Sequence, residues 1–250
     1  MSGHNKWSSI KHKKGAADAK RGKIFTRLVK EIILAAKNGG GDAEANPRLR
    51  TAILTAKAAN MPRENIERAI QRGTGEIEGV SYEEITYEGY GQAGVGIVID
   101  VMTDNRNRTV AELRHTLSKY GGNLAESGAV SWNFDFKGYF NVPVAGLDED
   151  EFMMQALEAG AEDVEMGEEY FEIYTSPTEF HTVLANFEAA GFPVENAELT
   201  RVPKTTINAD EVASKLLRLI DMLEELDDVQ KVYANFELSD EVMAELSAEE

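Results

Sequence analysis

Hydrophobic and polar positions follow a helical pattern from residue 22 to residue 72, after a basic arm over residues 1–21 that has little periodicity. Between residues 22 and 38 the apolar residues recur at spacings of three and four, as they do on one face of an amphipathic helix. These residues are Phe25, Leu28, Val29, Ile32 and Ala36. Two further helices are expected from Asn46 to about Ala59 and from Pro62 to Arg72, because Asn is a favoured N-cap and Pro a favoured first residue. The pattern therefore predicts a bundle of three short helices.

After a glycine-containing linker at residues 73–79, the hydrophobic period changes from 3.6 to 2. Strands are predicted over 82–88, 95–101 and 130–136, with a helix capped near Asn105 before the third strand. Residues 137–204 then follow the order strand, helix, strand, strand, helix, strand, which is typical of the ferredoxin-like split βαβ pattern. The predicted pieces are Tyr139–Val142, Glu149–Ala159, Asp163–Glu165, Tyr170–Tyr174, Pro177–Ala190 and Ala197–Arg201.

The last predicted helix and strand, Asp210–Leu226 and Val229–Glu237, have no partner within their own segment. The three strands and one helix of the middle domain lack a helix and a strand, so residues 205–238 are expected to return and complete that domain. The predicted fold is α+β and multidomain: a three-helix bundle followed by two α/β (ferredoxin-like) domains, the third inserted in the second. The predicted boundaries are 1–75 for the basic arm and bundle, 80–136 plus 205–238, and 137–204, with a frayed acidic tail over 239–250.

Charge divides the chain near the end of the bundle. The formal net charge is −18, yet residues 1–75 hold 16 Lys+Arg against 6 Asp+Glu, whereas residues 76–250 hold 10 against 38. An asymmetry of this kind indicates a polyanion-binding segment. The alternative is a solvated basic face that contacts nothing, but the concentration of positive charge on so acidic a chain favours binding. A membrane partner is not expected, because no apolar run approaches the roughly 20 residues of a spanning helix.

A lysine-rich arm precedes the first helix, and four cations lie on that helix opposite its apolar face. Lysines neutralise phosphates and an indole can stack on a base, although Trp7 could equally anchor the arm to the bundle. Lys57, Arg63, Arg68 and Arg72 add further positive charge to the bundle. The predicted nucleic-acid-binding residues are Lys6, Trp7, Lys11, His12, Lys13, Lys14, Lys20, Arg21, Lys23, Arg27, Lys30, Lys37, Arg48 and Arg50.

Residues that could carry catalysis or hold a cofactor do not form a recognisable set in the sequence. The chain has no Cys, which excludes disulfides, thiolate metal sites and a Cys nucleophile. Gly89, Gly91 and Gly94 match G-x-G-x-x-G, but a strand follows them instead of a helix, which favours a hairpin loop over a nucleotide site. We therefore expect no enzyme activity, no cofactor and no metal. The chain lacks a secretory signal, and a cytoplasmic location is expected.

Several long motifs resemble those of the YebC/PmpR family. They are GHNKWSSIKHKKGAADAKRGKIFTRL, ANPRLR, NMPRENIERAI, YEGYG, DNRNRTVAELRHTLSKYGGNL and KLLRLIDMLEELDDVQKVYANFE, in that order from residue 2 to about residue 240. The resemblance implies three domains with the third inserted in the second, and a DNA-binding transcriptional regulator. It also implies that the family's basic N-terminal motif falls on Lys6, Trp7, Lys11, His12, Lys13, Lys14, Lys20, Arg21 and Lys23. A mitochondrial relative is a translational activator of a cytochrome c oxidase subunit, and some bacterial members resemble ribosome-acting factors that ease synthesis of proline-rich stretches.

Three functions therefore stay open at the level of the sequence. The first is a non-catalytic transcriptional regulator that binds DNA through residues 1–75. The second is a translation factor that binds RNA on the ribosome, which a lysine-rich arm suits because folded RNA is recognised by shape and phosphate contacts. The third is an adaptor whose acidic domains bind a basic protein partner. The sequence does not indicate an oligomeric state.

Overall fold

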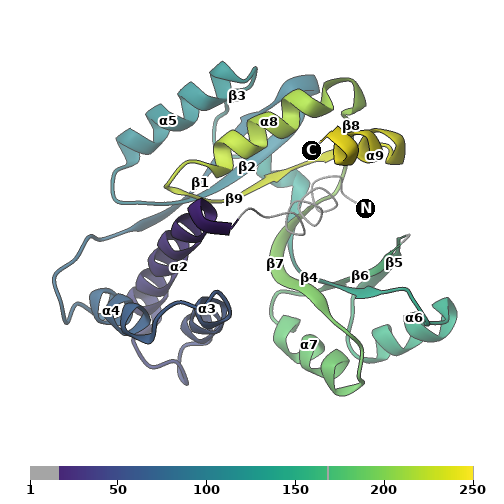
Figure 1. Cartoon of the computed structure of the whole chain (residues 1–250), viewed down its shortest axis with the longest axis horizontal. Coiled ribbons are helices and arrows are strands. Elements are labelled where there is room, and N and C mark those ends of the chain that lie inside the picture. The colour runs from purple at the N-terminus through teal and green to yellow at the C-terminus, as the bar shows by residue number, and fades with distance from the viewer. Residues whose placement is uncertain (1–16, 168, 250) are drawn as a thin grey trace. The chain divides into compact units, whose positions relative to one another are not determined.

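The computed structural model describes residues 17–167 and 169–249, with side chains from residue 22 to residue 246 except at 168. These residues form two compact units (Figure 1). Residues 17–129 and 211–233 make up the first, here called the N-terminal unit. Residues 130–210 and 234–249 make up the second, here called the ferredoxin-like unit.

Three helices open the N-terminal unit, as predicted. The long helix α2 packs against both of the shorter ones, and the residues between them form a hydrophobic core that includes Ile32, Leu49 and Ile66. The helices are α2 (Ala17–Gly39), α3 (Pro47–Ala58) and α4 (Arg63–Thr74). Asn46 caps α3, because its Oδ1 accepts a hydrogen bond from the amide of Leu49 at 3.1 Å. Its Nδ2 donates to the carbonyl of Ala35 in α2 at 2.8 Å, so one side chain both starts a helix and holds two helices together.

Helix α4 extends beyond the predicted end at Arg72 and into the predicted linker. The helix continues to Thr74, and Gly75 adopts the left-handed conformation of a C-cap with φ of 79°. Gly73 lies inside the helix where α4 approaches α2 closely: a Cβ at this position would lie 2.5 Å from the carbonyl oxygen of Ile33. Gly73 therefore allows close packing of α4 on α2 and does not end the helix.

A four-stranded sheet with the order β3-β1-β2-β9 completes the N-terminal unit. β1 and β2 form an antiparallel hairpin in which Glu83 faces Thr103 and Tyr90 faces Gly96. Helices α5 and α8 pack against each other over this sheet (Figure 1). The elements are β1 (Glu83–Tyr90), β2 (Gly96–Thr103), α5 (Arg106–Lys119), β3 (Asn123–Leu124), α8 (Ala213–Glu224) and β9 (Val229–Ala234). The helix and strand expected from the last part of the chain do join the middle sheet, so the insertion is confirmed; the domain boundaries themselves stay a prediction.

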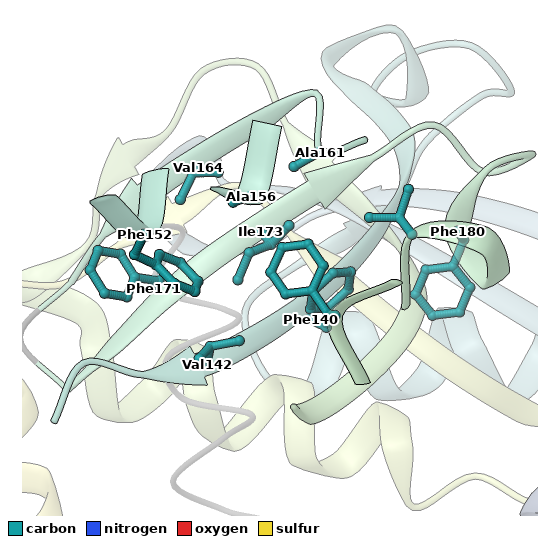
Figure 2. Close-up of a cluster of buried hydrophobic side chains, with 11 residues drawn as sticks. Phe140, Val142, Phe152, Ala156, Ala161, Val164, Phe171, Ile173 and Phe180 are labelled. Carbon is teal, nitrogen blue, oxygen red and sulfur yellow. The ribbon is translucent and has the colours of Figure 1, made fainter. Parts of the chain in front are cut away.

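The ferredoxin-like unit contains a second sheet, with the strand order β5-β6-β4-β7 and antiparallel pairing between all neighbours. This order and the two helices on one face confirm the ferredoxin-like prediction (Figure 1). Between helices and sheet lies an aromatic core in which Phe152 stacks on Phe171 at 4.3 Å, surrounded by Phe140 and Phe187 (Figure 2). The elements are β4 (Phe134–Pro143), α6 (Glu149–Glu158), β5 (Asp163–Met166), β6 (Tyr170–Thr175), α7 (Phe180–Ala189) and β7 (Glu195–Pro203).

Two expectations about this unit were wrong. The strand predicted at 130–136 begins only at Phe134, because Ser131–Asn133 form a short 3₁₀ turn, and it continues without a break into the strand predicted at 139–142 as β4. Gly138 lies inside this ladder, where a Cβ would lie 2.2 Å from Thr175 Oγ1. The predicted frayed tail contains helix α9 (Asp240–Glu249), whose Met243 is buried. Ahead of α9, β8 (Ile207–Asn208) and β10 (Phe236–Glu237) form a short parallel pair.

Candidate nucleic-acid interface

The predicted nucleic-acid-binding residues fall into three groups in the structure. The first group lies outside the described residues and comprises Lys6, Trp7, Lys11, His12, Lys13 and Lys14. Lys20 and Arg21 belong to α2, but their side chains are not among those described. The remaining residues, from Lys23 to Arg50, have described side chains. Their contacts show that they bond to other residues of the same unit.

The cationic face of α2 contacts the rest of the N-terminal unit. Lys23 Nζ donates to the carbonyl of Glu225 at 2.8 Å, and Arg27 donates through Nη2 to the carbonyl of Glu224. Both carbonyls belong to the C-terminal end of α8, whose own last turn contains no basic residue. The end of a helix carries unpaired carbonyls and partial negative charge, which cations stabilise. Two predicted binding residues therefore cap α8.

Lys30 is buried, with 5% of its surface exposed, and its ammonium is fully occupied within the unit. It pairs with Asp228 Oδ1 at 2.9 Å and donates to the carbonyls of Asp227 and Met102 at 2.9 and 3.2 Å. Asp228 also accepts from Arg108 Nη2 at 2.8 Å. The other donors to this carboxylate are the hydroxyls of Thr103 and Thr109, at 3.0 and 2.8 Å.

The electrostatics of this cluster favour an ionised Asp228. Burial alone would raise its pKa, but the hydrogen bonds from Arg108, Lys30 and Thr109 outweigh burial and lower the pKa to about 2. A buried carboxylate with four donors and a buried ammonium with three acceptors satisfy each other. The cluster thus joins α2 to α5 and to the start of β9.

The other placed residues also have partners in the unit. Lys37 donates to Ser81 Oγ at 2.8 Å and to the carbonyl of Tyr82 at 3.3 Å. Arg48 bonds two carboxylates, those of Glu31 and Glu84, and these bonds raise the pKa of its guanidinium above the usual value. Arg50 and Glu44 are both exposed and lie 3.9 Å apart, which is a weak surface pair.

The cations of α2 therefore do not form one free surface: Lys30 is buried and Arg27 is half-buried, whereas Lys23 and Lys37 are exposed but hydrogen-bonded within the unit. One apolar residue in the cationic row of α2 indicates in the sequence that this face of the helix is covered. Leu34 lies in the same row as the cations, one turn after Lys30, and is 4% exposed. The run from Ile32 to Ala36 is buried throughout, which indicates a helix covered on more than one side.

Exposed cations beyond the predicted binding residues lie on α3 and α4. Lys57, Arg68 and Arg72 are exposed and make no ion pair with any residue that the structure describes; we refer to these three as the bundle cations. Arg68 and Arg72 lie one turn apart on α4, so they project from the same face. Arg63, on the first turn of α4, has a side chain that is 89% exposed and pairs with Glu67 across one turn. These side chains can contact phosphates without breaking a buried interaction.

The described part of the chain shows neither a metal-binding cluster nor a membrane-spanning helix. Among residues 17–167 and 169–249, no group of three or more His, Asp or Glu side chains is arranged to hold a metal ion. None of the helices in the described range combines the length and apolar character needed to cross a membrane.

Two known family domains match consecutive parts of the chain. Residues 5–76 match the TACO1/YebC protein N-terminal domain, and residues 82–236 match the TACO1/YebC second and third domain. The two matches meet in the linker between the helical bundle and β1.

Individual relatives cover the chain from end to end. A probable transcriptional regulatory protein of Persephonella marina is 57% identical over 250 residues, covering 99% of this chain and 100% of the relative. One from Geobacter sulfurreducens is 58% identical over 247 residues, covering 98% and 100%. The crystal structure of a conserved hypothetical protein from Aquifex aeolicus is 53% identical, with a TM-score of 0.82 over 94% of this chain and 98% of that one.

Proposed function

Since the chain belongs to the TACO1/YebC family, we propose that it is a non-catalytic regulator that binds nucleic acid through residues 1–75 and acts on transcription. The observation that carries the proposal is the excess of positive charge in this segment, 16 Lys+Arg against 6 Asp+Glu, on a chain of net charge −18. The names of the relatives, probable transcriptional regulatory proteins, supply the regulatory role. A cytoplasmic location follows from the same proposal.

The contacts of α2 decide which of the proposed binding residues are available to a ligand. Lys30 serves the fold, and Lys23, Arg27, Lys37 and Arg48 are engaged in whole or in part inside the unit. The phosphate contacts therefore fall to the arm and to the bundle cations. When phosphates bind these cations, the counterions that are released favour binding, and no interaction within the fold has to be broken.

The proposal is tested by reversing the charge of the bundle cations in the full chain, as Lys57→Glu, Arg68→Glu and Arg72→Glu. Each lost phosphate contact should reduce the slope of log affinity against log salt by about 0.9 on duplex DNA, and affinity should fall with it. The readout is fluorescence anisotropy of a labelled duplex.

The matched control makes the same change in charge elsewhere on the N-terminal unit, as Arg114→Glu, Lys215→Glu and Arg218→Glu on α5 and α8. These three side chains are exposed and lie outside the bundle. The control should weaken binding only through general repulsion, with a nearly unchanged salt slope. Equal losses of affinity and slope in both variants would mean that the bundle does not form the interface.

RNA on the ribosome is the second candidate ligand, and the placement of the cations favours it. A helix that reads duplex DNA lies in the major groove with one long face against the bases. On α2, Lys23, Arg27 and Lys30 already bond to the end of α8 and to the segment that holds Asp228. The bundle cations lie on two helices of 12 residues each. Folded RNA is recognised through phosphates and shape, which scattered cations on short helices can provide.

Two assays at one salt concentration separate the candidates: cosedimentation of the full protein with ribosomes, and gel shift on promoter DNA. A transcriptional regulator should shift the promoter DNA and should be absent from the ribosome pellet. A ribosome-acting factor should do the opposite. If the chain is instead an adaptor whose acidic domains bind a basic protein, the variant with reversed bundle cations should bind that protein as well as the wild type does.

A further inference from the structure

Positive charge is rare in the ferredoxin-like unit and is gathered at one place. Residues 130–204 hold 16 Asp+Glu and only three Lys+Arg. The three are Lys137, Arg201 and Lys204, and all belong to the paired strands β4 and β7 or to the residue that follows β7. In this ladder Phe134 faces Pro203 and Phe136 faces Arg201, so the cations cluster at the end where β4 begins and β7 ends.

Two exposed aromatic side chains lie at the same end. Trp132, just before β4, is 67% exposed, and Phe136 is 47% exposed. Among the described residues these are the aromatic side chains that count as exposed, since the other Phe and Tyr rings are at least half-buried. The guanidinium of Arg201 lies over the ring of Phe136 at 5.9 Å, a cation–π arrangement that holds both groups at the surface.

Buried hydrogen bonds hold this end of the ladder in one conformation. Asn133 is 4% exposed, and its carbonyl accepts from the amide of Lys204 at 2.7 Å. Its side chain donates to the carbonyl of Thr205 at 2.9 Å and accepts from the amide of Thr205 at 3.1 Å. The backbone beside Trp132 is thereby joined to the backbone beside Lys204. A surface ordered in advance loses little conformational entropy when a ligand binds.

Exposed aromatic rings beside cations are the recognition elements of single-stranded nucleic acid, because bases stack on the rings while cations contact the backbone. We propose that Trp132, Phe136 and Arg201, here called the ribbon platform, form a stacking site for a short single-stranded segment. The inference rests on the proposed function for the class of ligand, and it places a second contact outside residues 1–75. Bases stack on Trp132 and Phe136, and Arg201 contacts a flanking phosphate.

Stacking supplies most of the affinity at this site. Lys204 pairs with Asp135 at 3.0 Å and Lys137 pairs with Glu162 at 2.5 Å, so part of the positive charge is already compensated. The surrounding acidic residues also repel a long polyanion. The ribbon platform therefore prefers a few unpaired bases to a duplex, and its binding depends on salt less steeply than binding by the basic N-terminal segment.

Tryptophan fluorescence of the full chain tests this site directly. The chain has two Trp residues, so the Trp7→Phe variant leaves Trp132 as the reporter. Titration with a short oligouridylate should quench its emission saturably, as stacking brings a base against the indole. Adding Phe136→Leu should raise the apparent Kd about tenfold, because one stacked base is lost. Adding Met154→Ala, which changes an exposed side chain of α6 with 63% exposure, should leave the Kd unchanged.

The outcomes distinguish this site from the proposed function. Quenching that persists when the bundle cations are reversed supports an independent ribbon platform. If emission does not change while the same protein still binds duplex DNA or folded RNA, the ribbon platform is excluded and the proposed function stands. A Kd that Phe136→Leu leaves unaltered also excludes it. If no nucleic acid binds in any of these assays, both proposals fail.

Discussion

Some charged residues of the N-terminal unit bond to each other within the fold and stabilise it. Lys30 was grouped from the sequence with the cations that bind phosphate, yet it lies 2.9 Å from Asp228 with 6% of its side chain exposed. A buried ammonium with these partners stabilises the fold and is not accessible to a ligand. Its removal leaves a buried carboxylate with fewer donors, and the energetic consequence is large.

We predict that Lys30→Met lowers the free energy of unfolding by about 3 kcal/mol, the low end for breaking a buried pair, because Arg108 and the two threonines still serve Asp228. Lys23→Met is the matched control, since Lys23 is exposed and bonds a carbonyl at the end of α8. It should cost less than about 1 kcal/mol. Urea unfolding of the two variants measures both values, and similar losses would contradict the assigned role of Asp228.

The same pair gives a pH dependence with a definite sign. The pKa of Asp228 is about 2 in the fold, below the ordinary aspartate value of about 3.9. A lowered pKa contributes stability that is complete above the unfolded value and is lost as pH falls through the folded value. The difference in unfolding free energy between wild type and Lys30→Met should therefore be constant near neutrality and shrink between about pH 4 and pH 2. A difference that grows on acidification would contradict the ion pair.

At the scale of elements, the packing of α2 against α4 depends on a glycine. A Cβ at position 73 would lie 2.5 Å from the carbonyl oxygen of Ile33 and 2.7 Å from the Cβ of Ala36. Gly73→Ala should therefore lower the free energy of unfolding by about 1–3 kcal/mol, the range for overpacking. Gly22→Ala on α2 is the control: a Cβ there meets nothing within 4 Å, and the substitution should stabilise the helix by up to about 1 kcal/mol.

Thermal unfolding followed by circular dichroism measures both changes, and opposite signs are expected for the two substitutions. If Gly73→Ala stabilised the protein as Gly22→Ala is expected to, then α4 would not approach α2 as closely as described.

Elements with strong local signals were predictable from the sequence. Asn46 and Asn105 cap helices in the structure as expected, because capping depends on the neighbouring amides alone. The order of strands and helices over 137–204 indicated the ferredoxin-like arrangement, since few topologies satisfy it. Helix α9 was missed because its sequence is acidic with little amphipathic pattern, and Met243 is the buried residue among the described side chains 240–246.

The candidate site was less predictable than the fold, for a physical reason. Which cations face solvent depends on tertiary contacts between α2 and residues about 200 positions later, such as Asp228. Helical spacing places Lys23, Arg27 and Lys30 on one face but does not say what covers that face. Only the buried Leu34 within the same row distinguished a covered face from a free one. Similarly, Trp132 and Lys204 are 72 residues apart and meet only through strand pairing.

At the scale of the whole molecule, the chain joins a basic segment to a longer acidic one. Residues 1–75 hold 16 Lys+Arg against 6 Asp+Glu, and residues 76–250 hold 10 against 38. The acidic part repels nucleic acid, so binding has to be oriented, and non-specific association elsewhere on the chain is weakened. This arrangement gives selectivity, because it favours a ligand whose phosphates reach the basic segment and stay away from the acidic surfaces.

The central claim is that the cations of the N-terminal segment bind nucleic acid, and its most direct test is salt-dependent binding by the full chain. Labelled duplex DNA and folded RNA are titrated with wild type and with Lys11→Glu, Lys13→Glu, Lys14→Glu, between about 50 and 200 mM salt. We predict steep salt dependence for the wild type, and for the variant weaker binding with a slope smaller by roughly 2.7 on duplex DNA, for three lost contacts. Equal affinity and slope for the two proteins, or no binding by the wild type at the lowest salt, would contradict it.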